Sequence, residues 1–161
     1  MGKYKLELRH RALPQEPFEQ KHKQFISKLS GLDSRWNLEG LGDLPEIGSE
    51  LLVTVALNKV LVAGVKGRLT YMYRDKDYLE DNAQFDDNMF IEFDSSKVEL
   101  SVVVDLLRVY IHAFGCYRAT IHNWDITRSD WPKIVDLCNA TGKDVNGRDG
   151  VYRINAINYY D

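Results

Sequence analysis

The segment Ser96–Gly115, SKVELSVVVDLLRVYIHAFG, constrains the fold more than any other part of the chain. Ser96 and Glu99 have the spacing of a capping box, in which two side chains satisfy backbone N–H groups of the first helical turn. The residues that follow recur at intervals of three and four and form a wide apolar face: Leu100, Val103, Leu107, Tyr110, Ile111 and Phe114. Gly115 is typical of a helix C-terminus. We therefore predict a mostly buried helix over residues 96–114, with the rest of the chain built around it.

Two further helices and several strands follow from the same kind of pattern. Alternation of apolar and polar residues predicts strands over residues 4–10, 68–73, 88–93, 117–122 and 151–157. Helical spacing predicts an amphipathic helix over 18–29, with Lys21, Lys23 and Lys28 on its outer side. A last helix is expected over 131–140, with Asp130 as its N-cap and Pro132 in its first turn.

Two segments are harder to assign. Residues 31–48 contain four glycines and a single Trp36, which indicates a loop fixed in place by that aromatic side chain. Residues 50–63 fit both a strand and a buried helix, because Leu51, Val53 and Val55 alternate while Glu50, Thr54 and Asn58 fall four apart. The pattern slightly favours the helix.

The order of these elements predicts an α+β fold. Strands and helices are mixed without regular alternation, which favours a largely antiparallel sheet with helices packed on one face around the central buried helix 96–114. The chain has 161 residues, of which 44% are hydrophobic and 28% charged. We therefore expect one α+β domain that comprises residues 1–161.

The most unusual segment is RDKDYLEDNAQFDD, residues 74–87. Its six carboxylates repel one another unless water, a cation or a basic partner compensates them. One interpretation is a solvated loop between two strands. The other is a partner-binding surface, in which carboxylates steer association and aromatic side chains anchor it. The predicted partner-binding residues are Asp75, Asp77, Tyr78, Glu80, Asp81, Phe85, Asp86 and Asp87.

No metal or cofactor site is expected from the sequence. The acidic segment has Leu79 and Glu80 where a calcium loop needs a ligand and a glycine, and in residues 144–150 Arg148 would bring a positive charge into the cation site. His112 and Cys116 have helical spacing, but Gly115 should end the helix between them. Phosphate-binding glycine motifs are absent from the sequence.

An alternative function is that of a small enzyme. His122 and Asp125 could act as a general base and its orienting acid. The narrow polar stripe of helix 96–114 could complete such a site with Ser101, Asp105, Arg108 and His112. No nucleophile motif accompanies these residues, so catalysis has no specific support in the sequence.

Charge and hydropathy bear on the class of partner. The formal net charge is −3 and the pI about 5.8, so we expect no direct nucleic-acid partner. The apolar runs are too short to cross a membrane, and the first residues lack the apolar core of a signal peptide. We therefore expect a cytoplasmic protein with no membrane contact.

The first quarter of the chain resembles a known class of protein. The opening strand, the amphipathic helix and the loop with Trp36 and Gly40 resemble certain immunity proteins that accompany bacterial polymorphic toxins. The resemblance implies an intracellular bacterial protein that neutralises a cognate toxin by direct binding. If the segment 74–87 makes the contact, its charge would suit a basic toxin. The sequence indicates neither the toxin's activity nor the oligomeric state.

Overall fold

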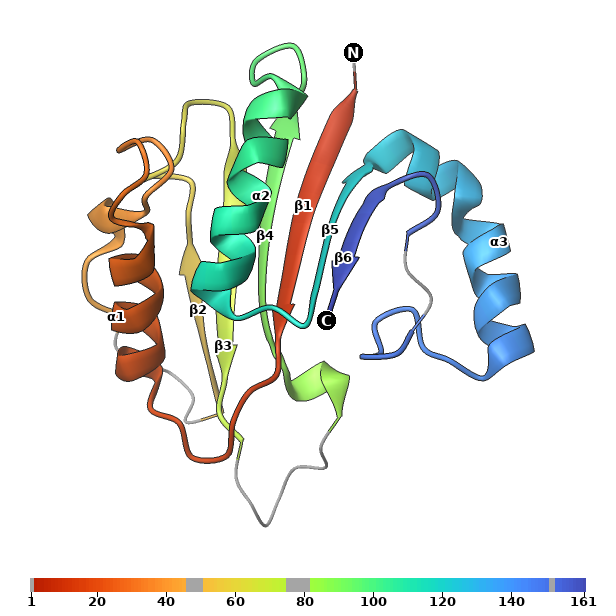
Figure 1. Cartoon of the computed structure of the whole chain (residues 1–161), viewed down its shortest axis with the longest axis horizontal. Coiled ribbons are helices and arrows are strands. Elements are labelled where there is room, and N and C mark those ends of the chain that lie inside the picture. The colour runs from red at the N-terminus through yellow and green to blue at the C-terminus, as the bar shows by residue number, and fades with distance from the viewer. Residues whose placement is uncertain (1, 46–50, 75–81, 151–152) are drawn as a thin grey trace.

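A computed structural model of the chain describes residues 2–45, 51–74, 82–150 and 153–161. Within these ranges lies one six-stranded sheet in the order β2-β3-β4-β1-β5-β6, and every neighbouring pair is antiparallel. The strands are β1 (Lys3–His10), β2 (Leu52–Ala56), β3 (Lys66–Met72), β4 (Asp87–Asp94), β5 (Arg118–Asn123) and β6 (Ile157–Tyr160). The helices are α1 (Phe18–Leu29), α2 (Leu100–Phe114) and α3 (Trp124–Thr141), with short 3₁₀ turns η1 (Glu39–Leu41) and η2 (Ala83–Phe85). Figure 1 shows this arrangement.

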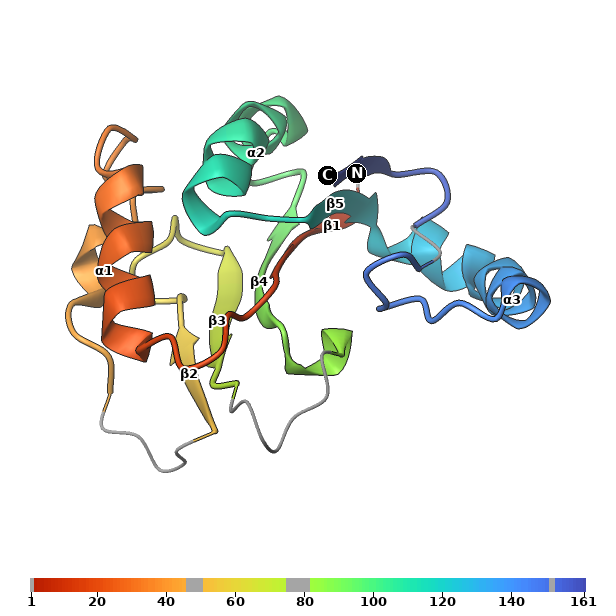
Figure 2. The same cartoon turned by 60° about the horizontal axis from the view of Figure 1, so that its bottom comes forward.

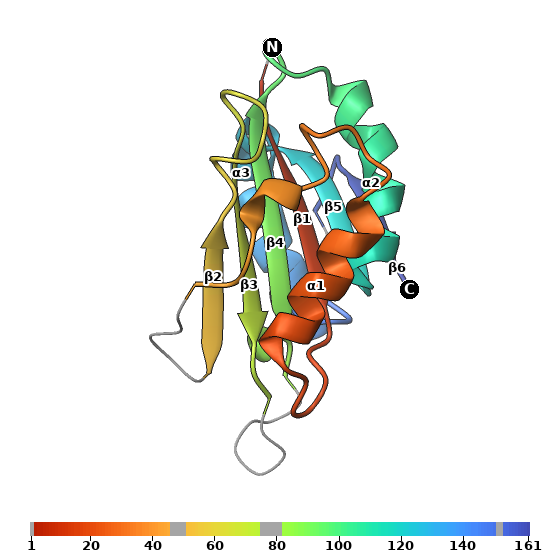
Figure 3. The same ribbon diagram turned by 90° about the vertical axis from the view of Figure 1, so that its left-hand side faces the viewer.

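The predicted α+β class and antiparallel sheet are confirmed. Helices α1 and α2 lie side by side on one face of the sheet, as Figures 2 and 3 show. Helix α3 differs from the expected arrangement, because it lies towards the opposite face and contacts β1 and β5. One face of the sheet is therefore covered by two helices, and the other is covered only near β1 and β5.

The core lies between the sheet and helices α1 and α2. Alternate residues of the strands, such as Leu6, Ile91 and Leu69, are fully buried there. The loop after α1 joins this core, as its single tryptophan predicted. Trp36 is buried, and its carbonyl oxygen accepts a 2.6 Å hydrogen bond from the hydroxyl of Tyr110 on α2.

The central helix is present, but the predicted capping box is wrong. Helix α2 begins at Leu100, and its N-cap Glu99 makes no side-chain cap hydrogen bond. Ser96 instead donates its backbone N–H (2.8 Å) and its hydroxyl (2.7 Å) to Oδ1 of Asp94, at the end of β4. Because Ser96 makes both of these hydrogen bonds to Asp94, its side chain does not cap the helix. Gly115 ends the helix with φ +66°, as predicted.

The predicted start of the last helix is also wrong. Helix α3 begins seven residues earlier than expected, at Trp124. Oδ1 of Asn123 caps it by accepting the backbone N–H groups of Asp125 and Ile126. Asp130 is buried within the helix and accepts a hydrogen bond from Asn155, while Pro132 lies in the helix interior.

The ambiguous segment contains a strand, so the weak preference for a helix is wrong. Leu52–Ala56 pairs with β3, and its side chains alternate between buried and exposed. The β-branched residues Val53 and Val55 supply the buried positions. Pairing with β3 therefore outweighed the spacing that favoured a helix.

Gly67 on β3 gives a test of core packing. A Cβ atom at this position would lie 2.8 Å from the backbone oxygen of Phe90 and about 3.1 Å from Leu57. We expect Gly67→Ala to lower the free energy of unfolding by about 1–3 kcal/mol, because backbone atoms cannot move aside cheaply. Gly31→Ala is the matched control, since nothing lies within 4 Å of a Cβ there. Urea unfolding of both variants checks the prediction, which fails if they are equally stable.

Candidate functional site

The predicted partner-binding residues fall into two groups. Asp75, Asp77, Tyr78, Glu80 and Asp81 lie outside the described residues. Phe85 is half-buried in η2. Asp86 and Asp87 are buried, with exposed fractions of 0% and 1%, so they are not part of an exposed acidic surface.

Asp86 is neutralised by two arginines of the same chain. Arg74, just after β3, donates from Nη2 to Oδ1 at 2.9 Å. Arg148 donates from Nε to Oδ2 at 2.9 Å and from Nη2 to Oδ1 at 2.8 Å. Arg148 is the residue whose charge argued against a calcium loop over 144–150, and the structure shows turns there. The positive charge that compensates this carboxylate therefore comes from arginines of the same chain.

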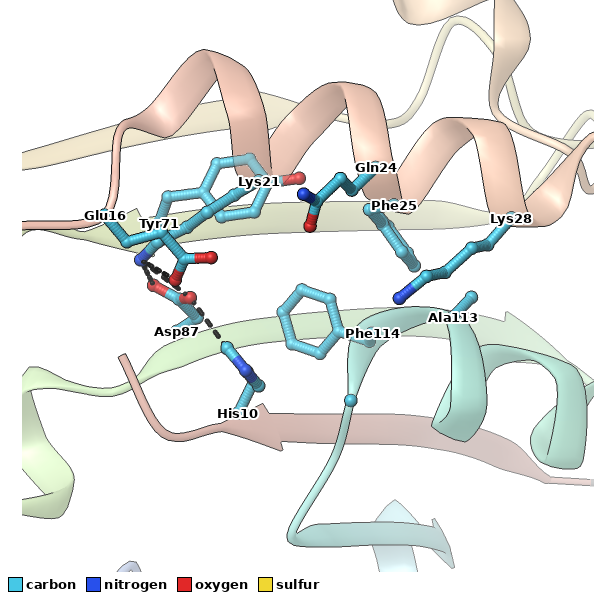
Figure 4. Close-up of a pocket in the computed structure, with 11 residues that line it drawn as sticks. His10, Glu16, Lys21, Gln24, Phe25, Lys28, Tyr71, Asp87, Ala113 and Phe114 are labelled. Atoms are coloured by element: carbon cyan, nitrogen blue, oxygen red, sulfur yellow. Dashed lines mark hydrogen bonds and ion pairs between the residues drawn. The ribbon is translucent and has the colours of Figure 1, made fainter. Parts of the chain in front are cut away.

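Asp87 is the centre of a second buried network, shown in Figure 4. Lys21 on α1 donates from Nζ to both carboxylate oxygens, at 3.1 and 3.0 Å, and to the carbonyl of Met72. The backbone N–H of Met72 donates to Oδ1 at 2.7 Å, and Nδ1 of His10 lies 3.0 Å from Oδ2. Lys21 was predicted on the outer side of its helix, and this prediction is wrong because the side chain is only 6% exposed.

This network borders a small cavity between α1, β1 and the end of α2. A histidine held by a carboxylate resembles a general base with its orienting acid. The cavity measures about 90 Å³, however, which is well below the roughly 300 Å³ at which small-molecule sites begin. Among the described lining residues none is Ser, Thr or Cys. The arrangement is therefore suited to fastening α1 to the sheet.

The alternative catalytic residues are not brought together. His122 is buried on β5, on the side of the sheet that faces α3. Asp125 is exposed in the first turn of α3, and the carboxylate beside His122 is that of Glu7, with Oε2 3.9 Å from Nδ1. Helix α2 lies against the other face of the sheet, with its polar stripe of Ser101, Asp105, Arg108 and His112 exposed to solvent.

The electrostatic setting of His122 keeps its ring neutral at neutral pH. Burial lowers the pKa of His122 to about 4, and the charges of Arg153 and Lys5 act in the same direction, whereas Glu7 opposes them. The Trp124 ring lies edge-on at 5.6 Å. Neither ring nitrogen has a hydrogen-bond partner among the described residues. A neutral buried histidine is a candidate for a pH-dependent effect on stability.

The sheet surface that faces away from α1 and α2 differs in character. We call the part of it over β2–β4, together with the start of β1, the open face. Its exposed cations are Lys3, Lys66 and Arg68, whereas Lys5 and Arg9 further along β1 are half-buried. Two half-buried carboxylates accompany them, Glu92 and Asp94. Exposed cations therefore outnumber carboxylates on the open face, although the whole chain has a net charge of −3.

Phe90 lies at the centre of the open face and positions two of the cations. Nζ of Lys5 is 4.5 Å from the ring centroid, and Cζ of Arg68 is 5.1 Å from it. A groove of about 770 Å³ extends beside this surface, with Lys3, Lys66, Trp124 and Arg128 among its lining residues. The groove has the volume of a binding site and combines an aromatic side chain with charged groups.

Three further observations concern metals, membranes and known proteins. Among the described residues, no group of three or more His, Cys, Asp or Glu side chains could hold a metal ion. None of the described helices combines the length and apolar character needed to cross a membrane. Comparisons with protein families, curated proteins and solved structures found no match.

The Lys21–Asp87 pair yields a prediction about stability. Lys21→Met leaves the Asp87 carboxylate buried without its main counter-ion, so we expect a loss of about 3–5 kcal/mol in the free energy of unfolding. Lys23→Met, two residues along α1, removes the same charge from an exposed position and should change stability little. Chemical denaturation measures both, and similar losses in the two variants would contradict the structural role of Asp87.

His122 yields a prediction about pH. Because its pKa is about 4 in the folded state and 6.5 in the unfolded chain, the unfolded chain binds the proton first as pH falls. The free energy of unfolding should therefore decrease between pH 6.5 and 4, by up to roughly 3 kcal/mol from this group. His122→Gln should remove that part of the slope, and exposed His112→Gln should retain it. Identical slopes for wild type and His122→Gln would refute the assignment.

Proposed function

We propose that the protein is an immunity-type binding protein that neutralises a cognate bacterial toxin by direct contact through the open face. The observation that supports this proposal best is the surface of β2–β4 that faces away from α1 and α2, against which Figure 2 shows no helix among the described elements. An uncovered sheet face next to a large groove is available to another protein without any rearrangement of the fold.

Fixed cations suit the open face to recognition. The Phe90 ring restrains the exposed Arg68, so less side-chain entropy is lost when a partner binds it. Lys5, which also contacts the ring, has a side chain only 14% exposed and forms a 2.9 Å salt bridge with Glu7, so it contributes less to the contact. The excess of cations favours a toxin with carboxylates on its contact surface, and long-range attraction would accelerate the encounter.

Trp124 supplies an anchor for the same contact. It lines the groove beside the open face, and its ring lies 5.0 Å from Nζ of Lys5. Tryptophan is among the residues that contribute most to protein interfaces when a partner covers them. The aromatic ring and the neighbouring cations therefore form one contiguous surface.

The enzyme alternative has less support. Its candidate residues lie on opposite sides of the sheet, and the carboxylate beside His122 is Glu7 instead of Asp125. A catalytic constellation needs its groups within hydrogen-bonding reach of one reacting atom. Binding of a partner to the open face does not require catalytic groups to be brought together in this way.

The test begins by purifying this chain from its native cell and identifying the protein that co-purifies with it. With that partner in hand, Lys66→Glu combined with Arg68→Glu should lower the association rate about tenfold or more at low salt, because two steering charges are reversed. The same variant should lose its protection of cells that express the partner. Stopped-flow association and a growth assay measure the two effects.

Lys23→Glu combined with Arg108→Glu is the matched control. It makes the same change in net charge at exposed positions on α1 and α2, on the other side of the sheet. This control should bind and protect like the wild type. If both double variants bind equally well, the open face is not the contact surface; if no protein partner is found, the immunity function itself is refuted.

A further inference from the structure

Strand β2 forms one edge of the sheet, and its register shows which backbone groups point outward. The N–H of Tyr73 donates to the carbonyl of Leu51, and the N–H of Leu57 donates to that of Gly67. Odd-numbered residues from 51 to 57 therefore exchange hydrogen bonds with β3. Leu52, Thr54 and Ala56 direct their N–H and C=O groups away from β3, and no described residue bonds to them.

Within the described part of the chain, this edge lacks the features that usually prevent strand addition. Edge strands are commonly protected by charged residues, proline, a bulge or a covering element. The sequence of β2 is LVTVA, and its pairing with β3 is continuous. Leu52 is 39% exposed, and Thr54 and Ala56 are also exposed. Among the elements that the structure describes, Figure 3 shows no helix or strand beyond β2.

We propose that β2 pairs antiparallel with β2 of a second copy of this chain, about a two-fold axis through Thr54. In this register Leu52 lies opposite Ala56 of the other copy, and Thr54 lies opposite its equivalent. A large side chain thus meets a small one, and no like charges oppose each other. The three opposed pairs each exchange two N–H···O bonds, which satisfies all the outward groups of the strand.

The opposite edge of the sheet fits this role less well. The N–H of Asp161 donates to the carbonyl of Tyr117, so within β6 only Asn158 and Tyr160 direct backbone groups outward. Pairing of β2 with β6 of another copy would also leave free edges and extend into a filament. The two-fold pairing of β2 closes after two copies.

The pairing makes one continuous sheet from two copies. A two-fold axis perpendicular to the sheet places the open faces of both copies on the same side. Five-residue strands bury less than the roughly 1,000 Å² of a stable interface, so the dimer should form only as concentration rises. This inference does not depend on the identity of any toxin.

The experiment measures the oligomeric state of the full chain by sedimentation velocity from the micromolar to the millimolar range. The wild type should shift from monomer to dimer as concentration increases. Thr54→Pro removes an outward N–H without touching the ladder to β3, so it should raise the dimer dissociation constant at least about tenfold. Thr54→Val, which also loses the 3.3 Å contact of its hydroxyl with Thr70, should dimerise like the wild type.

Two additional measurements keep the test decisive. Circular dichroism establishes that Thr54→Pro is folded, and Ala56→Lys, which places a charge opposite Leu52, should weaken the dimer if the proline variant unfolds. A wild type that stays monomeric at every concentration overturns the proposal. A dimer that persists in Ala56→Lys, or an assembly larger than a dimer, also overturns the proposal. The same holds if Thr54→Pro weakens the binding of another protein but leaves the self-association of this chain unchanged.

Discussion

The buried carboxylate of Asp87 joins elements that lie far apart in the sequence. It accepts hydrogen bonds from Lys21 on α1 and from the backbone of Met72 on β3, and it contacts His10 at the end of β1. A buried charge is tolerable only when such partners surround it. Asp86, the preceding residue, points to the other side of the chain and binds Arg74 and Arg148. These neighbouring carboxylates thus fix α1 on one side and the loop after α3 on the other.

Local pattern was enough to predict most of the fold, and it failed where distant contacts compete. The alternation of β1 and the apolar face of α2 follow directly from residue spacing. The N-terminus of α2 does not, because Asp94 engages Ser96 before it can cap the helix. Helix α3 had a usable signal in Asn123, which Pro132 obscured by its preference for a first turn. The short strand β2 is defined by its pairing with β3, which spacing within the segment cannot reveal.

The candidate site was harder to predict than the fold. The acidic segment is unusual in sequence, yet the partners of Asp86 and Asp87 come from residues as far away as Arg148 and Lys21. No local pattern identifies such pairs, so buried structural charges resembled a solvent-facing surface. The open face could not be predicted from the sequence for a different reason. Alternation predicted the strands β3 and β4, but it does not indicate which surface of the sheet remains uncovered, because that depends on the position of α3.

The division of the sheet into a covered face and an open face affects how the chain can diverge over evolutionary time. Exchanging an exposed side chain usually alters stability by less than about 0.5 kcal/mol, whereas removing a buried one typically costs several times more. Positions such as Lys66 and Arg68 alternate along β3 with buried Leu69 and with Gly67, which has no room for a Cβ atom. Mutational drift can therefore change the chemistry of one face while the other preserves the architecture. The same strand would carry one rapidly varying and one slowly varying set of residues.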